Sequence, residues 1–412
     1  MNKFKLRGAA LLLLLCLVLV LILAAGCRAS GPDGAGSMIS GETEQLSAAE
    51  SREETQSAIE SEPEESSEPE SEPEPVFEPV RLLAVGDNLI HDTLYNQAGR
   101  RTGGEGYDFL PVYDNVAELI GKADIAVINQ ETPLSASNPP STYPMFNCPT
   151  EMAGQLAQLG FDVVNIANNH MLDKFAAGLE ETIGLLRSTD GIAAVTGGYL
   201  GAEEWDEIPV VEKNGIKFAF LGYTESTNGI SLPSGREGMI IYTSNEAEIE
   251  KQVRAARELA DVVVVSCHWG VEYTHTPTDG QRALAKKLAQ WGADIVIGHH
   301  PHVIQPYEWL DGTLVIYSLG NFVSAQGKPE TLIGALVQLD IEKDSGGITI
   351  SEPEITPVIT HYDAGNYNVR IYRFDQYSDE LAAVHGVVVS HGKQFSMGYI
   401  RSVLTEVYGG EW

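Results

Sequence analysis

The stretch 294-DIVIGHHPHVIQPYEWLDGTLVIYSLGNF-322 decides both the fold and the candidate site of this chain. Its first four residues, 294–297, predict a short buried strand, and His299, His300 and His302 follow directly after a glycine. Histidines at the exit of a strand can offer neutral imidazole nitrogens to a metal ion. The alternative is a polar turn whose histidines have no joint role. Further segments of the chain favour the metal interpretation.

From position 81 onward, apolar runs alternate with helical patterns. Buried strands are predicted within RLLAVGD (81–87), ADIAVINQET (123–132), FDVVNIANNH (161–170) and DVVVVSCHWGVEY (261–273), the last of them ending at His268. Helices are predicted over residues 108–122, 150–159, 243–260 and 279–291. This alternation indicates an α/β domain.

Other segments are extended and rich in turns. Residues 192–224 and 332–360 predict antiparallel strands that complete the sheets, and the pair Asp311-Gly312 predicts a tight hairpin because both positions tolerate positive φ. Residues 361–412 predict a strand, a loop and a terminal helix near 396–407.

Each run that is predicted to be a buried strand ends near a polar residue able to bind a metal ion. These residues are Asp87, Glu131, Asn169, His268, His300 and His302. Strand ends are where open α/β sheets place their ligands. Singly, each has an ordinary alternative as a turn cap, a surface group or a buried core histidine. Together they exceed the needs of one tetrahedral ion and suit two divalent ions bridged by a carboxylate and a water.

The ordered motifs GDN, NQETP, NIANNHMLD, HWGVEY and GHHPHVIQPYEW…YSLGNF resemble the CapA family of poly-γ-glutamate capsule-synthesis proteins, the PGA_cap domain. That family is similar to the calcineurin-like metallophosphoesterases. The resemblance covers residues 81–341 and implies a four-layer αββα sandwich with two divalent ions, of Mn, Fe, Zn or Mg, at the strand ends. It implies that Asp87 binds one ion, that Glu131 bridges both, and that Asn169, His268, His300 and His302 complete the ligand set. It also implies that His170 is the general acid, and we expect Asp173 to orient it.

Three positions depart from the phosphoesterase pattern. The first motif has Leu89 where that pattern has a histidine, so one ligand is missing unless His91 or Asp92 replaces it. The bridging position is Glu131 instead of Asp. His299 stands where the pattern has a glycine.

The N-terminus predicts export. Three basic residues precede an apolar run from position 9 to 25, and Gly26-Cys27 follows it, as in a bacterial lipobox. We expect residues 1–27 to be a signal peptide with lipidation of Cys27. An uncleaved signal anchor is the alternative, because the run is long for a signal core. Both predict tethering to the extracytoplasmic face of the plasma membrane.

Residues 28–80 are predicted to form a disordered acidic linker, because this Ser-, Glu- and Pro-rich segment has few apolar groups and its carboxylates repel one another. The CapA-type domain is predicted over 81–341, with a C-terminal extension over 342–412 that completes it or packs on it. The net charge of −32 argues against nucleic acid as a partner, since that needs a basic surface.

Two functions fit these features. The first is a metal-dependent hydrolase that cleaves a phosphoester or another ester or amide bond, with His170 protonating the leaving group. The second is a non-catalytic component of capsule synthesis or export whose metal site binds an anionic polymer. Capsule-synthesis membrane proteins are the expected partners of either. Cys148 and Cys267 are too few for a disulfide framework, so we expect free thiols.

Overall fold

The computed structural model describes residues 77–412. The signal, lipobox and linker predictions at 1–76 therefore lie outside the described residues. The strands are β1 Val80–Asn88, β2 Ile125–Gln130, β3 Val163–Asn165, β4 Ala194–Thr196, β5 Val210–Lys213, β6 Ile216–Thr224, β7 Val262–His268, β8 Ile295–His299, β9 Ile304–Leu310, β10 Thr313–Leu319, β11 Asn321–Val323, β12 Ile333–Asp344, β13 Gly347–Ile350, β14 Glu354–Asp363 and β15 Tyr367–Arg373.

The α-helices are interspersed with the strands as far as Trp291, and three more follow the last strand. They are α1 Asp92–Arg101, α2 Leu110–Tyr113, α3 Ala117–Gly121, α4 Glu151–Leu159, α5 Phe175–Arg187, α6 Glu246–Leu259, α7 Asp279–Trp291, α8 Asp379–Val384, α9 Gly386–Val389 and α10 Met397–Tyr408. Short 3-10 turns lie at Ala202–Glu204, Glu237–Met239, Pro329–Leu332 and Phe374–Gln376. None of the helices between positions 77 and 412 is long and apolar enough to cross a bilayer.

Two sheets form the centre of the domain. The nine-stranded sheet has the path β15-β14-β12-β1-β2-β3-β4, with β11 beside β1 and β13 beside β12. The six-stranded sheet has the order β5-β6-β7-β8-β10-β9. In both sheets the strands predicted to be buried run parallel to one another, so their carboxyl ends lie at the same edge.

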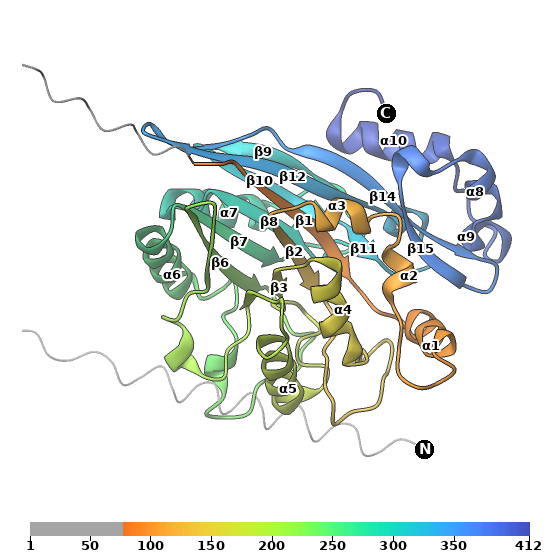
Figure 1. Cartoon of the computed structure of the whole chain (residues 1–412), viewed down its shortest axis with the longest axis horizontal. Coiled ribbons are helices and arrows are strands. Elements are labelled where there is room, and N and C mark those ends of the chain that lie inside the picture. The colour runs from red at the N-terminus through yellow and green to blue at the C-terminus, as the bar shows by residue number, and fades with distance from the viewer. Residues whose placement is uncertain (1–76) are drawn as a thin grey trace, which may run out of the picture. The chain divides into compact units, whose positions relative to one another are not determined.

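The side chains of β6 show how the layers form. Phe218 and Phe220 join the core that the two sheets share, whereas Ala219 and Leu221 join a second core under α6 and α7. Successive residues of a strand point to opposite faces, so a continuous apolar run can supply both cores at once. The apolar side chains of α4 and α5 belong to the same contiguous cluster as those of the nine-stranded sheet. The two sheets with helices on their outer faces match the predicted αββα arrangement (Figure 1).

Several predicted boundaries are confirmed by local chemistry. Helix α7 covers the predicted residues 279–291, because a capping box between Thr278 and Gln281 starts it and Gly292, with φ of 112°, ends it. The predicted hairpin joins β9 to β10, with φ of 51° at Asp311 and 91° at Gly312. Helix α6 is slightly shorter than the predicted 243–260, and the terminal helix α10 lies close to the predicted 396–407.

The single helix predicted over 108–122 is wrong. The segment forms two short helices, α2 and α3, separated at residues 114–116. The Asn115 side chain donates a hydrogen bond to the Ile371 carbonyl of β15 across 2.8 Å. Val112, Tyr113 and Val116 are all buried in the core, so tertiary packing overrides the helical period here.

The antiparallel prediction for 192–224 is confirmed for the pair β5 and β6 and is wrong for the other pairings of this segment. β4 runs parallel to β3, and β6 runs parallel to β7. Helix α5 was not predicted from the sequence. It provides the crossover connection that the parallel strands β3 and β4 require. Helix α1 was not predicted either, and the third strand was predicted too long, since β3 ends at Asn165. Antiparallel pairing is confirmed for β12, β13 and β14 within 332–360.

The C-terminal region continues the nine-stranded sheet. Strand β12 passes position 341, and β14 and β15 lie beyond it at the edge of the same sheet. Helix α9 packs against β14 and α8, whereas α10 contacts β9 of the six-stranded sheet (Figure 1).

Candidate functional site

The carboxyl ends of the central strands bring the predicted residues into one buried cluster. Asp87 is the penultimate residue of β1, and Glu131 follows β2 directly. His268 ends β7, whereas His300 and His302 lie just beyond β8. Asn169 reaches the cluster from the loop after β3.

Two glycines let the strand ends approach closely. A Cβ atom at Gly86 would lie 1.9 Å from the Gly320 carbonyl oxygen, and one at Gly298 would lie 1.9 Å from that of Tyr317. Both contacts are far below a permitted distance, so the glycines before Asp87 and before the histidine loop are required by the packing.

Glu131 lies between two groups of side chains. Its Oε1 atom lies 3.6 Å from His268 Nε2, and its Oε2 atom lies 3.9 Å from His302 Nδ1. The residue is fully buried, and neither oxygen has a hydrogen-bond partner among residues 77–412. An unpaired buried carboxylate is costly, so its oxygens require a ligand.

Asp87 and His302 form the group on the Oε2 side. His302 Nδ1 lies 3.3 Å from Asp87 Oδ2, and a ligand atom from each of Asp87, Glu131 and His302 lies within 4.8 Å of the others. The Asn129 amide and the His300 backbone N–H donate to the two Asp87 oxygens at 2.8 and 3.2 Å.

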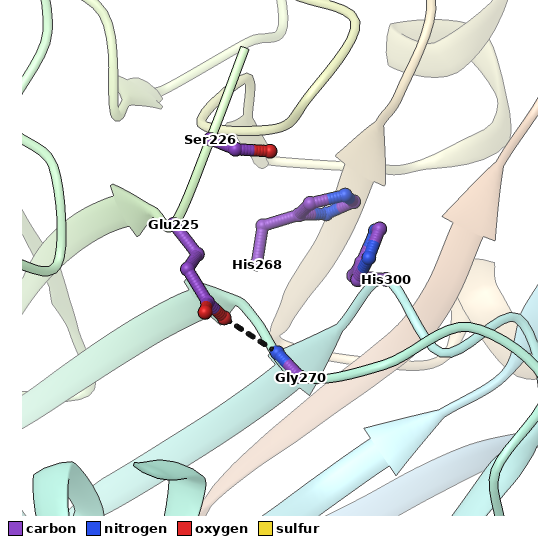
Figure 2. Close-up of a pocket in the computed structure, with 5 residues that line it drawn as sticks. All are labelled: Glu225, Ser226, His268, Gly270 and His300. Carbon is purple, nitrogen blue, oxygen red and sulfur yellow. Dashed lines mark hydrogen bonds between the residues drawn. The ribbon is translucent and has the colours of Figure 1, made fainter. Parts of the chain in front are cut away.

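Asn169, His268 and His300 form the group on the Oε1 side. His268 Nε2 lies 3.1 Å from Asn169 Oδ1, and the rings of His268 and His300 have centroids 4.9 Å apart. These two imidazoles line a cavity of about 120 Å³ together with Glu225, Ser226 and Gly270. Figure 2 shows the five residues around it. The Glu225 carboxylate accepts the Gly270 N–H across 2.8 Å.

The backbone of the histidine loop is unusual. His300 has φ of 96° and His302 has φ of 57°, a region that side chains other than glycine rarely adopt. Such conformations cost about 1–3 kcal/mol each and persist where surrounding structure holds them. Here they direct the imidazoles on either side of Pro301 into one cluster.

The ionisation of the cluster reflects burial and crowding. Burial and the nearby Asp87 charge raise the pKa of Glu131 well above its usual value. Burial acts upward on Asp87 as well, but contacts with His299 and His302 hold the pKa of Asp87 well below its usual value. Burial opposes protonation of His302, yet Glu131 and Asp87 raise its pKa to about 9. A cation between the carboxylates would replace these protons.

Neutral imidazoles line the other side of the cluster. Burial and the neighbouring His300 lower the pKa of His268 well below its usual value, and burial with His302 lowers that of His300 to about 4. Neutral nitrogens of this kind are the form that binds metal ions. The donor set and the unpaired buried oxygens therefore fit divalent cations.

His170 and Asp173 lie at the edge of the cluster. His170 Nδ1 lies 2.8 Å from Asp173 Oδ2, which leaves Nε2 available to a ligand. Asn228 connects this pair to the cluster, because it contacts His170 Nδ1 at 3.4 Å and accepts from the Asn169 amide at 3.3 Å. The Phe146 ring packs edge-on against the His170 ring.

The structure adds residues that sequence reasoning did not assign. Asn321, in the LGNF motif, pairs with Asp87 between β11 and β1, and its Oδ1 atom lies 3.0 Å from His302 Nδ1. His299 Nδ1 lies 3.3 Å from Asp87 Oδ1. His91 and Asp92, the suggested replacements in the first motif, are not among the ion pairs of Asp87 or Glu131 in the described region.

Comparison with known proteins gives consistent matches. The family described as bacterial capsule synthesis protein PGA_cap matches residues 81–326. The PGA biosynthesis protein CapA of Bacillus subtilis (strain 168) is 37% identical over 207 residues, which are 50% of this chain and 53% of that protein. The capsule biosynthesis protein CapA of Bacillus anthracis is 34% identical over 238 residues, 54% of this chain and 55% of that protein. The matched region thus spans about half the length of these relatives.

Among solved structures, the calcineurin-like phosphoesterase YfkN from Bacillus subtilis aligns with a TM-score of 0.43 and 16% sequence identity. The alignment covers 69% of this chain and 91% of that chain.

Proposed function

We infer the function of this chain from its site and from its family, because the chain belongs to the PGA_cap family of bacterial capsule synthesis proteins. It is a metal-dependent hydrolase that acts on the capsule polymer or on a phosphoester precursor. The observation that carries this proposal is Glu131, a buried carboxylate with both oxygens unpaired among the described residues and with histidines on each side. A purely structural glutamate at this depth would be paired.

Two divalent ions fit the cluster, one on each side of Glu131. Asp87 and His302 would hold one ion, and Asn169, His268 and His300 the other. When bound, such ions supply Lewis acidity towards a phosphoryl or carbonyl oxygen and lower the pKa of a coordinated water. The residues of the chain do the rest: they fix the spacing of the donors and exclude bulk water from a buried site.

His170 is the proton donor to the leaving group in this proposal. Asp173 holds Nδ1, so the imidazole presents Nε2 and keeps one orientation. Asn228 links the pair to Asn169, which couples the position of the acid to that of the donor set.

The protein works at the extracytoplasmic face of the plasma membrane, anchored through Cys27 by lipid or through an uncleaved signal segment. The order of basic residues, apolar run and Gly26-Cys27 supports this placement. Membrane proteins of capsule synthesis are the partners that fit the family, and the anionic polymer or a phosphoester is the substrate that fits the site.

The test is metal analysis of residues 77–412 together with a panel of phosphodiester and poly-γ-glutamate substrates in Mn²⁺. We expect two bound ions and turnover of at least one class. His361→Ala is a matched control, because His361 is buried in β14 outside the cluster and bonds Tyr377. Bound metal with polymer binding but without turnover would instead support the non-catalytic function. Absence of bound metal would reject both.

A further inference from the structure

His299 is a buried histidine whose two ring nitrogens make no hydrogen bond to the described residues. It ends β8, is 1% exposed, and neither Nδ1 nor Nε2 makes a hydrogen bond within residues 77–412. A neutral imidazole carries one N–H donor and one lone pair, and a buried ring that leaves both without a hydrogen bond is unusual. Some ligand therefore belongs beside this ring.

The sheet register aims His299 at the candidate site. His268 and His299 are partners on the parallel strands β7 and β8, so their side chains leave the same face of the six-stranded sheet. His299 Nδ1 comes within 3.3 Å of Asp87 Oδ1, a contact that brings nitrogen and carboxylate together without hydrogen-bond geometry. This is the separation expected of two donors that face a common ion.

The Asp87 side of Glu131 has fewer candidate metal ligands than the other side. On the Oε1 side, His268 also contacts Asn169 and lies ring to ring with His300, whereas Asp87 and His302 alone were assigned to the Oε2 side. The first motif offers Leu89 there, which is buried and has no donor atom.

Neither alternative in the first motif fills the gap in the structure. His91 Nδ1 contacts the Leu89 carbonyl at 3.1 Å, and no contact of His91 with either carboxylate falls within ion-pair distance among the described residues. Asp92 begins helix α1, where its Oδ1 atom accepts the Thr93 N–H at 2.8 Å.

We propose that His299 is a direct ligand of the ion on the Asp87 side and takes the place of the histidine that the first motif lacks. The inference rests on the proposed two-ion site and adds a donor to it. Each side of Glu131 then has three metal ligands. These are Asp87, His299 and His302 on one side and Asn169, His268 and His300 on the other.

The test measures metal content and metal–metal coupling in the full-length protein loaded with Mn²⁺. The wild type is expected to hold two ions that give an exchange-coupled electron paramagnetic resonance signal. His299→Gln is expected to hold one ion and to give the signal of an isolated Mn²⁺, or to bind the second ion at least tenfold more weakly. His361→Gln, a buried histidine away from the site, should match the wild type.

The outcomes separate this inference from the proposed function. Two coupled ions in His299→Gln with unchanged affinity would overturn the role of His299 and leave the metal site standing. Loss of one ion in His91→Gln, with His299→Gln unaffected, would assign the missing ligand to His91 instead. A wild type that binds no ion would reject both proposals.

A crystal structure of the Zn²⁺-loaded wild type tests the same claim without any variant, and so does not depend on how a variant folds. A nitrogen of His299 should lie about 2.1 Å from one ion. A separation beyond about 3 Å, with the ion present, would contradict the proposal.

Discussion

The Nδ1 atom of His170 lies 2.8 Å from the Oδ2 atom of Asp173, and the same oxygen accepts the Phe146 N–H across 2.7 Å. The backbone N–H of Phe146 therefore fixes the Asp173 carboxylate, and this carboxylate in turn orients the His170 imidazole. His170→Ala should retain the bound metal, because this imidazole is outside the proposed ligand set, while turnover falls about 10²–10⁴-fold. Metal content and kcat measured on the same sample check this.

Asp173→Asn is the companion variant. It should keep the metal, lower kcat less than His170→Ala, and alter the pH profile of kcat, because it changes what His170 Nδ1 contacts. If His170→Ala lost metal as fully as a ligand variant, the assigned roles would be wrong. Normal capsule synthesis in His170→Ala cells would exclude catalysis through this residue and favour the binding function.

His268→Ala and His300→Ala should each strip metal from the site, since each removes a nitrogen that water replaces poorly. Elemental analysis after gel filtration is the measurement. His391→Ala serves as the control, because His391 is exposed and outside the cluster. Full metal occupancy in both site variants would contradict the assignment of these two histidines.

Cys148 and Cys267 are free and buried, which confirms the expected absence of a disulfide between them. Cys267 joins the core under α6 and α7, whereas Cys148 joins the core on the other side of the six-stranded sheet. Burial raises the pKa of both thiols, so alkylation should be slow in the native protein and complete after unfolding. Peptide mass spectrometry should then find both sites modified, and a linked peptide pair would refute this.

Acid should destabilise the domain partly through His385. The neutral ring donates from Nε2 to the Thr360 carbonyl at 3.0 Å and accepts the Val387 N–H at Nδ1 across 2.9 Å. Burial lowers the pKa of His385 from 6.5 to about 4, against the opposing effect of the Thr360 bond. As the pH falls, His385 is therefore protonated in the unfolded chain before it is protonated in the folded chain. The contribution of His385 to the free energy of unfolding is complete above pH 6.5 and is lost as the pH falls towards 4.

The size of this contribution is about 2–3 kcal/mol between pH 7 and pH 4.5. Urea unfolding at the two pH values measures it. The lowered pKa values of His268, His300 and His361 act in the same direction, whereas the raised pKa of His302 acts against them, so the informative quantity is the difference between the wild type and His385→Gln. The variant should be less stable at pH 7 and lose less stability on acidification. Equal pH slopes in the two proteins would show that His385 is not responsible.

The proposed attachment through Cys27 predicts a diacylglyceryl group on that thiol at the mature N-terminus. Mass spectrometry of the membrane fraction should find the modified peptide, and Cys27→Ala should abolish the modification. An intact Met1 on the membrane-bound protein would leave the signal anchor as the mode of attachment.

The sequence by itself determined the features that depend on local pattern. Apolar runs long enough to be covered on both faces marked the parallel strands, and the polar residues after them marked one edge of the sheets. Thr278 and Gln281 set the start of α7, and Asp311-Gly312 set the hairpin, because capping and turn chemistry act over a few residues.

Only the tertiary structure decided which candidate metal ligands lie together in the cluster and which lie outside it. The contact of Asn115 with Ile371 divides a predicted helix, and it joins positions far apart in the chain. The register of β7 against β8 places His299 beside His268. The positive φ of His300 directs its own imidazole into the same cluster. These relations depend on strand pairing and backbone geometry over long separations, which no periodicity in the sequence records.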